Sequence, residues 1–220
     1  MKTINGILKK YSHAWVFLYW LIYLPWFGWL ERTVTTNFHV LESTWDKYIP
    51  FCEYFIVPYL LWFPFVAAVI TWFFLKEDRK SFYQMTAYLY AGMTLFLVFC
   101  TLYPNGLNLR PQVIPRDNIF VDMVRAIWAV DTPTNVLPSL HVFNSVACCV
   151  AVFRSEKLKK YPFLLGLTLS LTVAICLATM FLKQHSVIDV VMALFMAFVL
   201  YHAIYAPVKV RKYSAAGSRT

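Results

Sequence analysis

The chain has 220 residues, of which 60% are hydrophobic, 19% are aromatic and 14% are charged, and its formal net charge is +9. A water-soluble domain is nearer half apolar and a quarter charged, so this composition excludes an ordinary soluble globular protein. A basic excess of this size is, taken alone, also typical of nucleic-acid binding.

Six apolar runs are long enough, or nearly so, to cross a ~30 Å hydrocarbon core as helices of roughly 20 residues. No cleavage site with small residues follows the first run, so we expect a retained span rather than a signal peptide. We place the spans at about residues 14–30, 54–75, 85–103, 137–153, 162–182 and 186–207. The sequence therefore predicts an all-α, polytopic six-helix membrane bundle that forms a single integral membrane domain over residues 1–220.

The third connection, residues 104–136, is far longer than a joint between helices usually needs. Prolines break its first half, and Ile119, Met123, Ile127 and Val130 recur at helical spacing in its second half. We therefore expect an extended stretch followed by an amphipathic helix that lies on the outer face of the bundle.

Basic residues are distributed unevenly between the two sides of a six-span topology. Fourteen of the 20 Lys and Arg residues lie in the two tails, the second connection and the fourth connection. The positive-inside rule then predicts that both termini are cytoplasmic, in a plasma or inner membrane. Topology and attraction to anionic lipid account for the excess, so no nucleic-acid partner is expected. Four of the six outer basic residues fall in or near the third connection and the sixth span: Arg110, Arg116, Arg125 and Lys183.

The fourth span opens with polar residues, in the segment "NVLPSLH". Pro138 suits the first turn of a helix, where its missing N–H has no partner. Free amides and the helix dipole favour an anion at such a terminus, and Ser139 adds a hydroxyl beside His141. The same residues are also compatible with a polar helix start at the wet interface.

The sixth span opens with "LKQHSVIDVV". His185 and Asp189 are four residues apart and share one face of a helix. A carboxylate at this depth requires a partner, and an imidazole held by a carboxylate is a better nucleophile or base. Lys183 supplies a cation nearby. A purely structural His–Asp pair that joins two helices is the alternative.

Arg110 and Arg116 add guanidinium groups on the same side, and the arginine fork matches phosphate oxygens. Each alone is compatible with a loop charge that meets lipid headgroups. Two histidines, a carboxylate, a helix N-terminus and several cations at one membrane face together favour phosphoryl transfer through a phosphohistidine.

Three motifs in order, Arg110-Pro111, Pro138-Ser-Leu-His141 and His185-x-x-x-Asp189, resemble the type 2 phosphatidic acid phosphatase superfamily. These are metal-independent membrane lipid phosphatases related to vanadium haloperoxidases and to some headgroup transferases. The resemblance covers about residues 85–207, which would form the catalytic core. It implies that His185 is the nucleophile, Asp189 its relay carboxylate and His141 the acid. It also implies phosphate contacts from Arg110, Ser139 and the amides around Leu140.

The chain departs from the family pattern at several positions. Tyr103 replaces a lysine of the first motif, Leu140 replaces glycine in the second, and Ala178 and Thr179 replace Ser-Arg in the third. We hypothesise that Lys183 and Arg116 substitute for the missing cations, Lys183 by continuing the fifth helix past Thr179.

The leading hypothesis is hydrolysis of a lipid phosphomonoester or diphosphate at the extracytoplasmic face. The Pro-Ser-Leu-His and Lys-Gln-His variants are similar to inositol phosphorylceramide synthases, so transfer of the headgroup to an alcohol is the alternative. A transporter or scaffold that binds lipid headgroups is the third. Because the chain has no C-x-x-C motif and no carboxylate cluster suited to Mg²⁺, we expect no metal and no cofactor.

Overall fold

The computed structural model describes residues 9–205. The tail lysine Lys2, the last two residues of the expected sixth span and the basic residues of the C-terminal tail lie outside this range. The elements, in chain order, are η1 (Ser12–Tyr19), α2 (Trp20–Thr33), β1 (His39–Val40), η2 (Thr44–Tyr48), η3 (Glu53–Phe55), α3 (Ile56–Lys76), α4 (Arg79–Leu102), β2 (Asn105–Gly106), α5 (Ile119–Val130), α6 (Leu140–Arg154), α7 (Pro162–Phe181) and α8 (Val187–Tyr205).

Four helices are long and apolar enough to cross a membrane: Glu53–Lys76, Arg79–Leu102, Pro162–Phe181 and Val187–Tyr205. They mark the chain as an integral membrane protein and match four of the predicted spans. The six-span count is not confirmed, because the other two segments are shorter as regular helix. The 15 residues of α6 extend only about 22 Å at 1.5 Å per residue. The first span is divided between the 3-10 helix η1 and the 14-residue α2.

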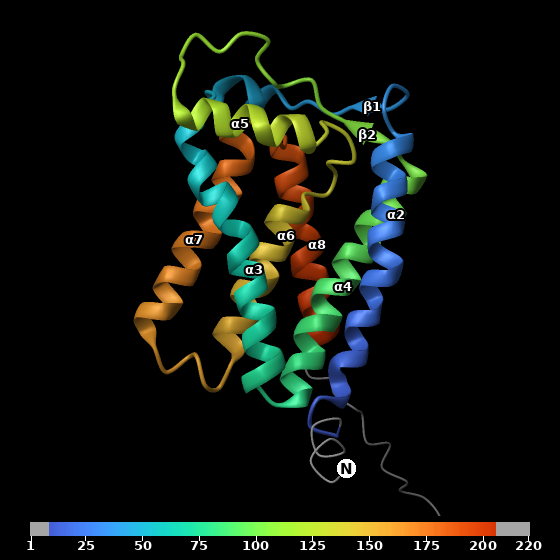
Figure 1. The fold of residues 1–220 in the computed structure, drawn as a ribbon, viewed down its shortest axis with the longest axis vertical. Helices are drawn as coiled ribbons and strands as arrows, with labels where there is room; N and C mark the ends of the chain where they lie inside the picture. The colour runs from blue at the N-terminus through green and yellow to red at the C-terminus, as the bar shows by residue number, and fades with distance from the viewer. Residues whose placement is uncertain (1–8, 206–220) are drawn as a thin grey trace, which may run out of the picture.

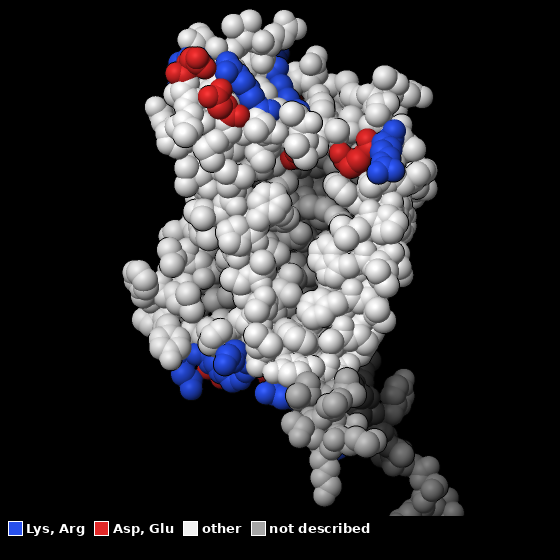
Figure 2. All heavy atoms as spheres, in the orientation of Figure 1, with Lys and Arg blue, Asp and Glu red and all other residues white. Residues whose placement is uncertain are grey.

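The long helices run side by side, and α5 crosses one end of the bundle (Figure 1). The strands β1 and β2 lie at the same end, which we call the α5 end. Charged side chains on the visible face gather at the two ends of the molecule and leave a broad uncharged belt between them (Figure 2). Such a belt is what a membrane-spanning bundle presents to lipid.

Three separate loops meet at the α5 end. His39 and Val40 pair in parallel with Asn105 and Gly106, and Gly106 forms a further bridge with Thr134. The fully buried Asn105 accepts hydrogen bonds from the amides of Val136 and Leu137, both at 2.9 Å. The entry to α6 is therefore held by the end of α4.

The amphipathic helix of the third connection is confirmed, but its predicted apolar face is partly wrong. Ile119 and Val130 are 69% and 83% exposed, whereas Val121 and Val124 are buried. Asn118 caps the helix by accepting from the amides of Phe120 and Val121. Tertiary contacts with η3 and α3, rather than helical periodicity alone, decide which face of α5 is covered.

The third span begins six residues earlier than predicted, because Asp78 caps α4. One carboxylate oxygen of Asp78 accepts from the amide of Ser81 at 3.0 Å, and the other accepts from its hydroxyl at 2.7 Å. In the middle of the bundle α4 and α6 approach closely where Gly92 faces Phe143. A Cβ atom at Gly92 would lie 2.1 Å from the Phe143 ring.

Replacement of Gly92 by Ala should lower the free energy of unfolding by about 1–3 kcal/mol, because the fully buried Phe143 ring has little room to move. Gly166→Ala is the matched control, since no atom lies within 4 Å of a Cβ at Gly166. Thermal unfolding in detergent micelles, followed by tryptophan fluorescence, measures both. Equal melting temperatures for the two variants would contradict close packing at Gly92.

Candidate active site

His185 and Asp189 form the pair that the sequence predicts. His185 Nδ1 lies 3.3 Å from Asp189 Oδ2, and the Asp189 side chain is fully buried. His185 itself precedes α8 rather than lying within its first turn, since α8 begins at Val187. The amide of Ser186 also donates to Asp189 Oδ2 at 2.9 Å, which fixes the carboxylate beside the imidazole.

His141 brings a second imidazole to the same place from α6. The ring centroids of His141 and His185 are 5.8 Å apart. The rings of Tyr59 and Trp62 from α3 pack against His141 with centroid separations of 4.7 and 4.5 Å. One small group could therefore be reached from both imidazoles, while aromatic rings limit the positions that His141 adopts.

Ser139 caps the N-terminus of α6. Its hydroxyl accepts from the amide of Val142 at 3.4 Å, so Ser139 is the N-cap. Pro138 therefore lies before the helix, and its predicted place in the first turn is wrong. The amide of Ser139 donates to the carbonyl of Asp189 at 3.2 Å, which ties α6 directly to α8. The first-turn amides of α6, beginning at Leu140, have no acceptor within the helix.

Arg110 reaches the site through Gln184. Its Nη2 donates to Gln184 Oε1 at 2.5 Å and to the carbonyl of Asp131 at 2.6 Å, and its Nη1 donates to the carbonyl of Trp128 at 3.0 Å. Its Nε is buried without a partner among the described residues. Burial lowers the pKa of the Arg110 guanidinium from its ordinary value, and Asp131 and Tyr59 oppose that shift. Arg110 still carries its positive charge, because guanidinium does not deprotonate in proteins.

Lys183 is not presented to the site as predicted. The helix α7 ends at Phe181, and Lys183 has a φ of 57°, so the helix does not continue from Thr179. The Lys183 ammonium instead donates to the carbonyls of Asp46 and Ile49 at 3.0 and 2.5 Å. Burial lowers the pKa of Lys183, and Asp46 partly offsets the shift. Lys183 therefore anchors the loop between α2 and α3.

The guanidinium of Arg116 also binds groups outside the site of the two histidines. Its Nη2 lies 3.2 Å from the buried carboxylate of Glu53 and 3.4 Å from the carbonyl of Phe51. Arg125, the other basic residue of the third connection, pairs with Asp117 and Asp122 in exposed positions. Of the four basic residues that the sequence placed near the motifs, only Arg110 contacts a side chain that lines the cavity of the two histidines, namely Gln184.

A cavity of about 530 Å³ lies beside the two histidines, and exposed residues such as Leu24 and Phe63 form part of its lining. Aromatic and aliphatic residues of α2, α3 and α4 line one part of it, among them Tyr23, Phe27 and Phe96. The polar part is formed by His141, His185, Gln184, Glu31, Asp131, Thr132, Thr134 and Asn135. Figure 2 shows this face hollowed below α5, between the positions of α3 and α2 in Figure 1. The cavity can accommodate a molecule with a polar head and an apolar chain.

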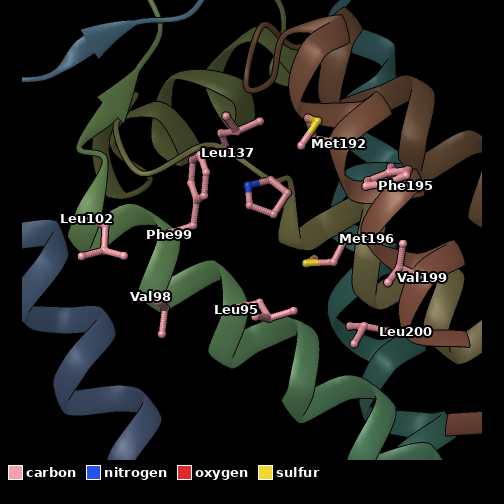
Figure 3. Close-up of a pocket in the computed structure, with 11 residues that line it drawn as sticks. Leu95, Val98, Phe99, Leu102, Leu137, Met192, Phe195, Met196, Val199 and Leu200 are labelled. Atoms are coloured by element: carbon pink, nitrogen blue, oxygen red, sulfur yellow. The ribbon is translucent and has the colours of Figure 1, made fainter. Parts of the chain in front are cut away.

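A second pocket, of about 340 Å³, lies between α4 and α8 (Figure 3). Figure 3 shows Leu95, Phe99, Met192, Phe195 and Met196 around it. All its lining residues are apolar, so it offers no group that binds phosphate or moves a proton.

Several residues of the site were missed by sequence reasoning. Asp46 is 4% exposed and accepts from Ser43 N, Ser186 Oγ and Val187 N at 2.7, 2.6 and 2.9 Å. It thereby fixes the residue next to His185. The only signal was a Ser43-x-x-Asp46 capping box, which indicates a helical turn but not its tertiary partner.

Asp131 was also missed. Its Oδ2 accepts from the hydroxyl of Tyr59 at 2.7 Å and from Gln184 Nε2 at 2.9 Å. This links α3, the third connection and the turn before α8 in one hydrogen-bond network around the histidines. No local pattern could have indicated it, because the partners are 72 and 53 residues away.

Within residues 9–205, no group of three or more His, Cys, Asp and Glu side chains has an arrangement that could hold a metal ion. The five cysteines are free, and three of them are buried.

Comparisons with protein-family models, with curated proteins and with solved structures found no match.

Replacing Asp46 by Asn should lower the free energy of unfolding by about 1–3 kcal/mol, because an amide has one acceptor oxygen for three buried or part-buried donors. Glu42→Gln is the control in the same loop, since Glu42 is exposed and should change stability by less than about 0.5 kcal/mol. Thermal unfolding in micelles measures both, and an unchanged melting temperature for Asp46→Asn would contradict the anchoring role of Asp46.

Proposed function

We propose that this protein is a metal-independent membrane lipid phosphatase that acts through a phosphohistidine, and that it belongs to the type 2 phosphatidic acid phosphatase superfamily. The observation that carries the proposal is the convergence of His141 and His185, 5.8 Å apart, beside a fully buried Asp189. The part-polar, part-apolar cavity supports a substrate with a phosphate head and a hydrocarbon chain.

In the proposed first step, His185 Nε2 attacks phosphorus and the bond from phosphorus to the lipid oxygen breaks. The Asp189 carboxylate at Nδ1 holds the tautomer that leaves Nε2 free to attack, and it stabilises the cationic ring that forms. His141 gives a proton to the departing lipid oxygen, which leaves as an alcohol.

In the second step, a water molecule attacks the phosphohistidine and transfers its proton to His141. The bond from phosphorus to Nε2 breaks and inorganic phosphate leaves. The first-turn amides of α6 and the positive charge of Arg110 are the groups best placed to stabilise the charged intermediate state. Lys183 and Arg116 have no part in this scheme, since their charges are committed to loop carbonyls and to Glu53.

We propose a six-span topology in which α5 and the site face the extracytoplasmic side of a plasma or inner membrane, with both termini cytoplasmic. The positive-inside rule supports it: Lys76, Arg79 and Arg154 are helix-terminal residues at the end remote from α5, and Lys157 lies in the connection between α6 and α7 at the same end.

Headgroup transfer to an alcohol is the second candidate. It is favoured by one specific observation, the carboxylates of Glu31 and Asp131 in the cavity beside His141. Such acceptor groups suit the hydroxyls of an alcohol better than a second phosphate.

His185→Ala should reduce phosphate release from phosphatidic acid in mixed micelles at least about 10³-fold and abolish the acid-labile phosphoenzyme. His141→Ala should reduce it by about 10²–10⁴-fold. His202→Ala is the control, because His202 lies exposed on α8 near its other end. All assays contain EDTA, which should leave the wild-type rate unchanged.

Phosphate release that persists in His185→Ala, or the absence of any phosphoenzyme in the wild type, would contradict the proposal. Intact transport or lipid binding without turnover would instead support a transporter or scaffold.

A further inference from the structure

A groove of about 520 Å³ lies between α6 and α8, lined by residues that the proposed chemistry does not use. On α6 its lining begins at Val146 and ends at Arg154, the last residue of that helix. These positions are about 12 Å apart at 1.5 Å per residue. Because α6 starts at the α5 end, the groove runs toward the opposite end of the bundle (Figure 1). We call it the Arg154 groove.

The walls of the Arg154 groove are mainly hydrocarbon and are open to the outside of the bundle. Phe153 of α6 and Leu194 and Phe198 of α8 line it, and all three are exposed. The helix α8 is one of those long and apolar enough to cross a membrane. In a bilayer such a face meets the hydrocarbon chains of lipids rather than water.

Arg154 brings a cation to one end of this apolar groove. Its Cζ lies 5.0 Å from the ring centroid of Tyr205 and 5.8 Å from that of Tyr201, and its Nη1 donates to the hydroxyl of Tyr201 at 3.0 Å. Contact with aromatic faces leaves the in-plane N–H groups of a guanidinium available for other acceptors. The two tyrosines therefore hold the guanidinium in place without using most of its donors.

No carboxylate neutralises Arg154 among residues 9–205, since none lies within 4.0 Å of its nitrogens. The nearby acidic side chains have other partners. Glu77 accepts from the hydroxyl of Ser155 at 2.5 Å, and Glu156 pairs with Lys159 at 2.6 Å. The positive charge at the end of the groove is thus available to an external anion.

The connection that follows α6 makes the surroundings of Arg154 basic. Residues 154–160 contain one acidic residue, Glu156, and four basic ones, Arg154, Lys157, Lys159 and Lys160. Such a segment attracts anionic lipid headgroups, and it disfavours a headgroup that carries a cation of its own.

We propose that the Arg154 groove binds one anionic phospholipid from the leaflet remote from α5. The guanidinium of Arg154 binds the phosphate oxygens, which match its fork of donors, and the groove holds part of an acyl chain. A free phosphate ion has no chain to cover the exposed apolar walls, so the ligand is a lipid. The site is separate from the two histidines and does not depend on the proposed function.

Native mass spectrometry of the full chain, purified and delipidated in detergent, tests the site by counting bound lipids. Phosphatidylglycerol and phosphatidylcholine with identical chains are titrated separately. The first phosphatidylglycerol should bind about tenfold or more tightly than phosphatidylcholine, and Arg154→Gln should remove most of this difference. Lys159→Gln is the control, because it removes one positive charge from the same connection but does not line the groove.

A second pair of variants tests the place of the acyl chain. Leu194→Trp should weaken the binding of phosphatidylglycerol, because an indole fills part of the groove. Leu167→Trp is the control, since Leu167 is exposed on α7 outside the groove. Inorganic phosphate at the same concentration as the lipid should not displace it.

Several results would overturn the Arg154 groove as a lipid site. Equal affinities of the wild type for the two lipids would do so, even if a variant fails to fold. Equal effects of Arg154→Gln and Lys159→Gln, or displacement of the lipid by inorganic phosphate, would also do so. Binding that is lost in His185→Ala and kept in Arg154→Gln would assign the lipid to the histidine cavity instead. A dimer that Leu194→Trp dissociates would show that a second copy of the chain covers the groove.

Discussion

The buried carboxylate of Asp189 is the constraint from which the arrangement of the α5 end follows. Asp189 Oδ2 accepts from His185 and from the amide of Ser186, while its backbone carbonyl accepts from Ser139. A carboxylate in an apolar interior is tolerated only where such donors reach it. The N-termini of α6 and α8 must therefore meet at this point. His141 and His185 are carried there by the same two elements, which accounts for the short separation of their rings.

Residues from two other connections complete the surroundings of the pair. Asp46 accepts a hydrogen bond from Ser186, the residue after His185. Asn105 accepts from the two amides before Pro138, and Arg110 donates to Gln184. Each of these side chains satisfies backbone or side-chain groups that would otherwise be buried without partners, so the loops at this end are tied to the helices. The aromatic side chains of α2 and α3 line the apolar part of the cavity, next to its polar part. A polar head and an apolar chain can thus be bound in one cavity.

Local patterns predicted the parts of the site that depend on short spacing. The pair His185 and Asp189, four residues apart, and the start of α6 near Ser139 could be found from sequence because their partners are near in the chain. The role of Lys183 could not, because a left-handed residue ends α7 and turns the ammonium toward a loop 134–137 residues away. Glu31 and Asp131 were missed for the same reason: each is a single carboxylate whose partners lie on other elements. The helix α5 was predicted, but its covered face depends on contacts with η3 and α3 that no periodicity describes.

The central claim is that both imidazoles reach one phosphorus atom. A structure of the protein with orthovanadate, a mimic of the five-coordinate phosphoryl state, tests it most directly. The account predicts vanadium bonded to Nε2 of His185, with His141 within hydrogen-bond distance of an apical oxygen and the vanadate clear of the carboxylates of Glu31 and Asp131. Vanadate bound away from residue 185, or seated between Glu31 and Asp131 with both rings unoccupied, would contradict it.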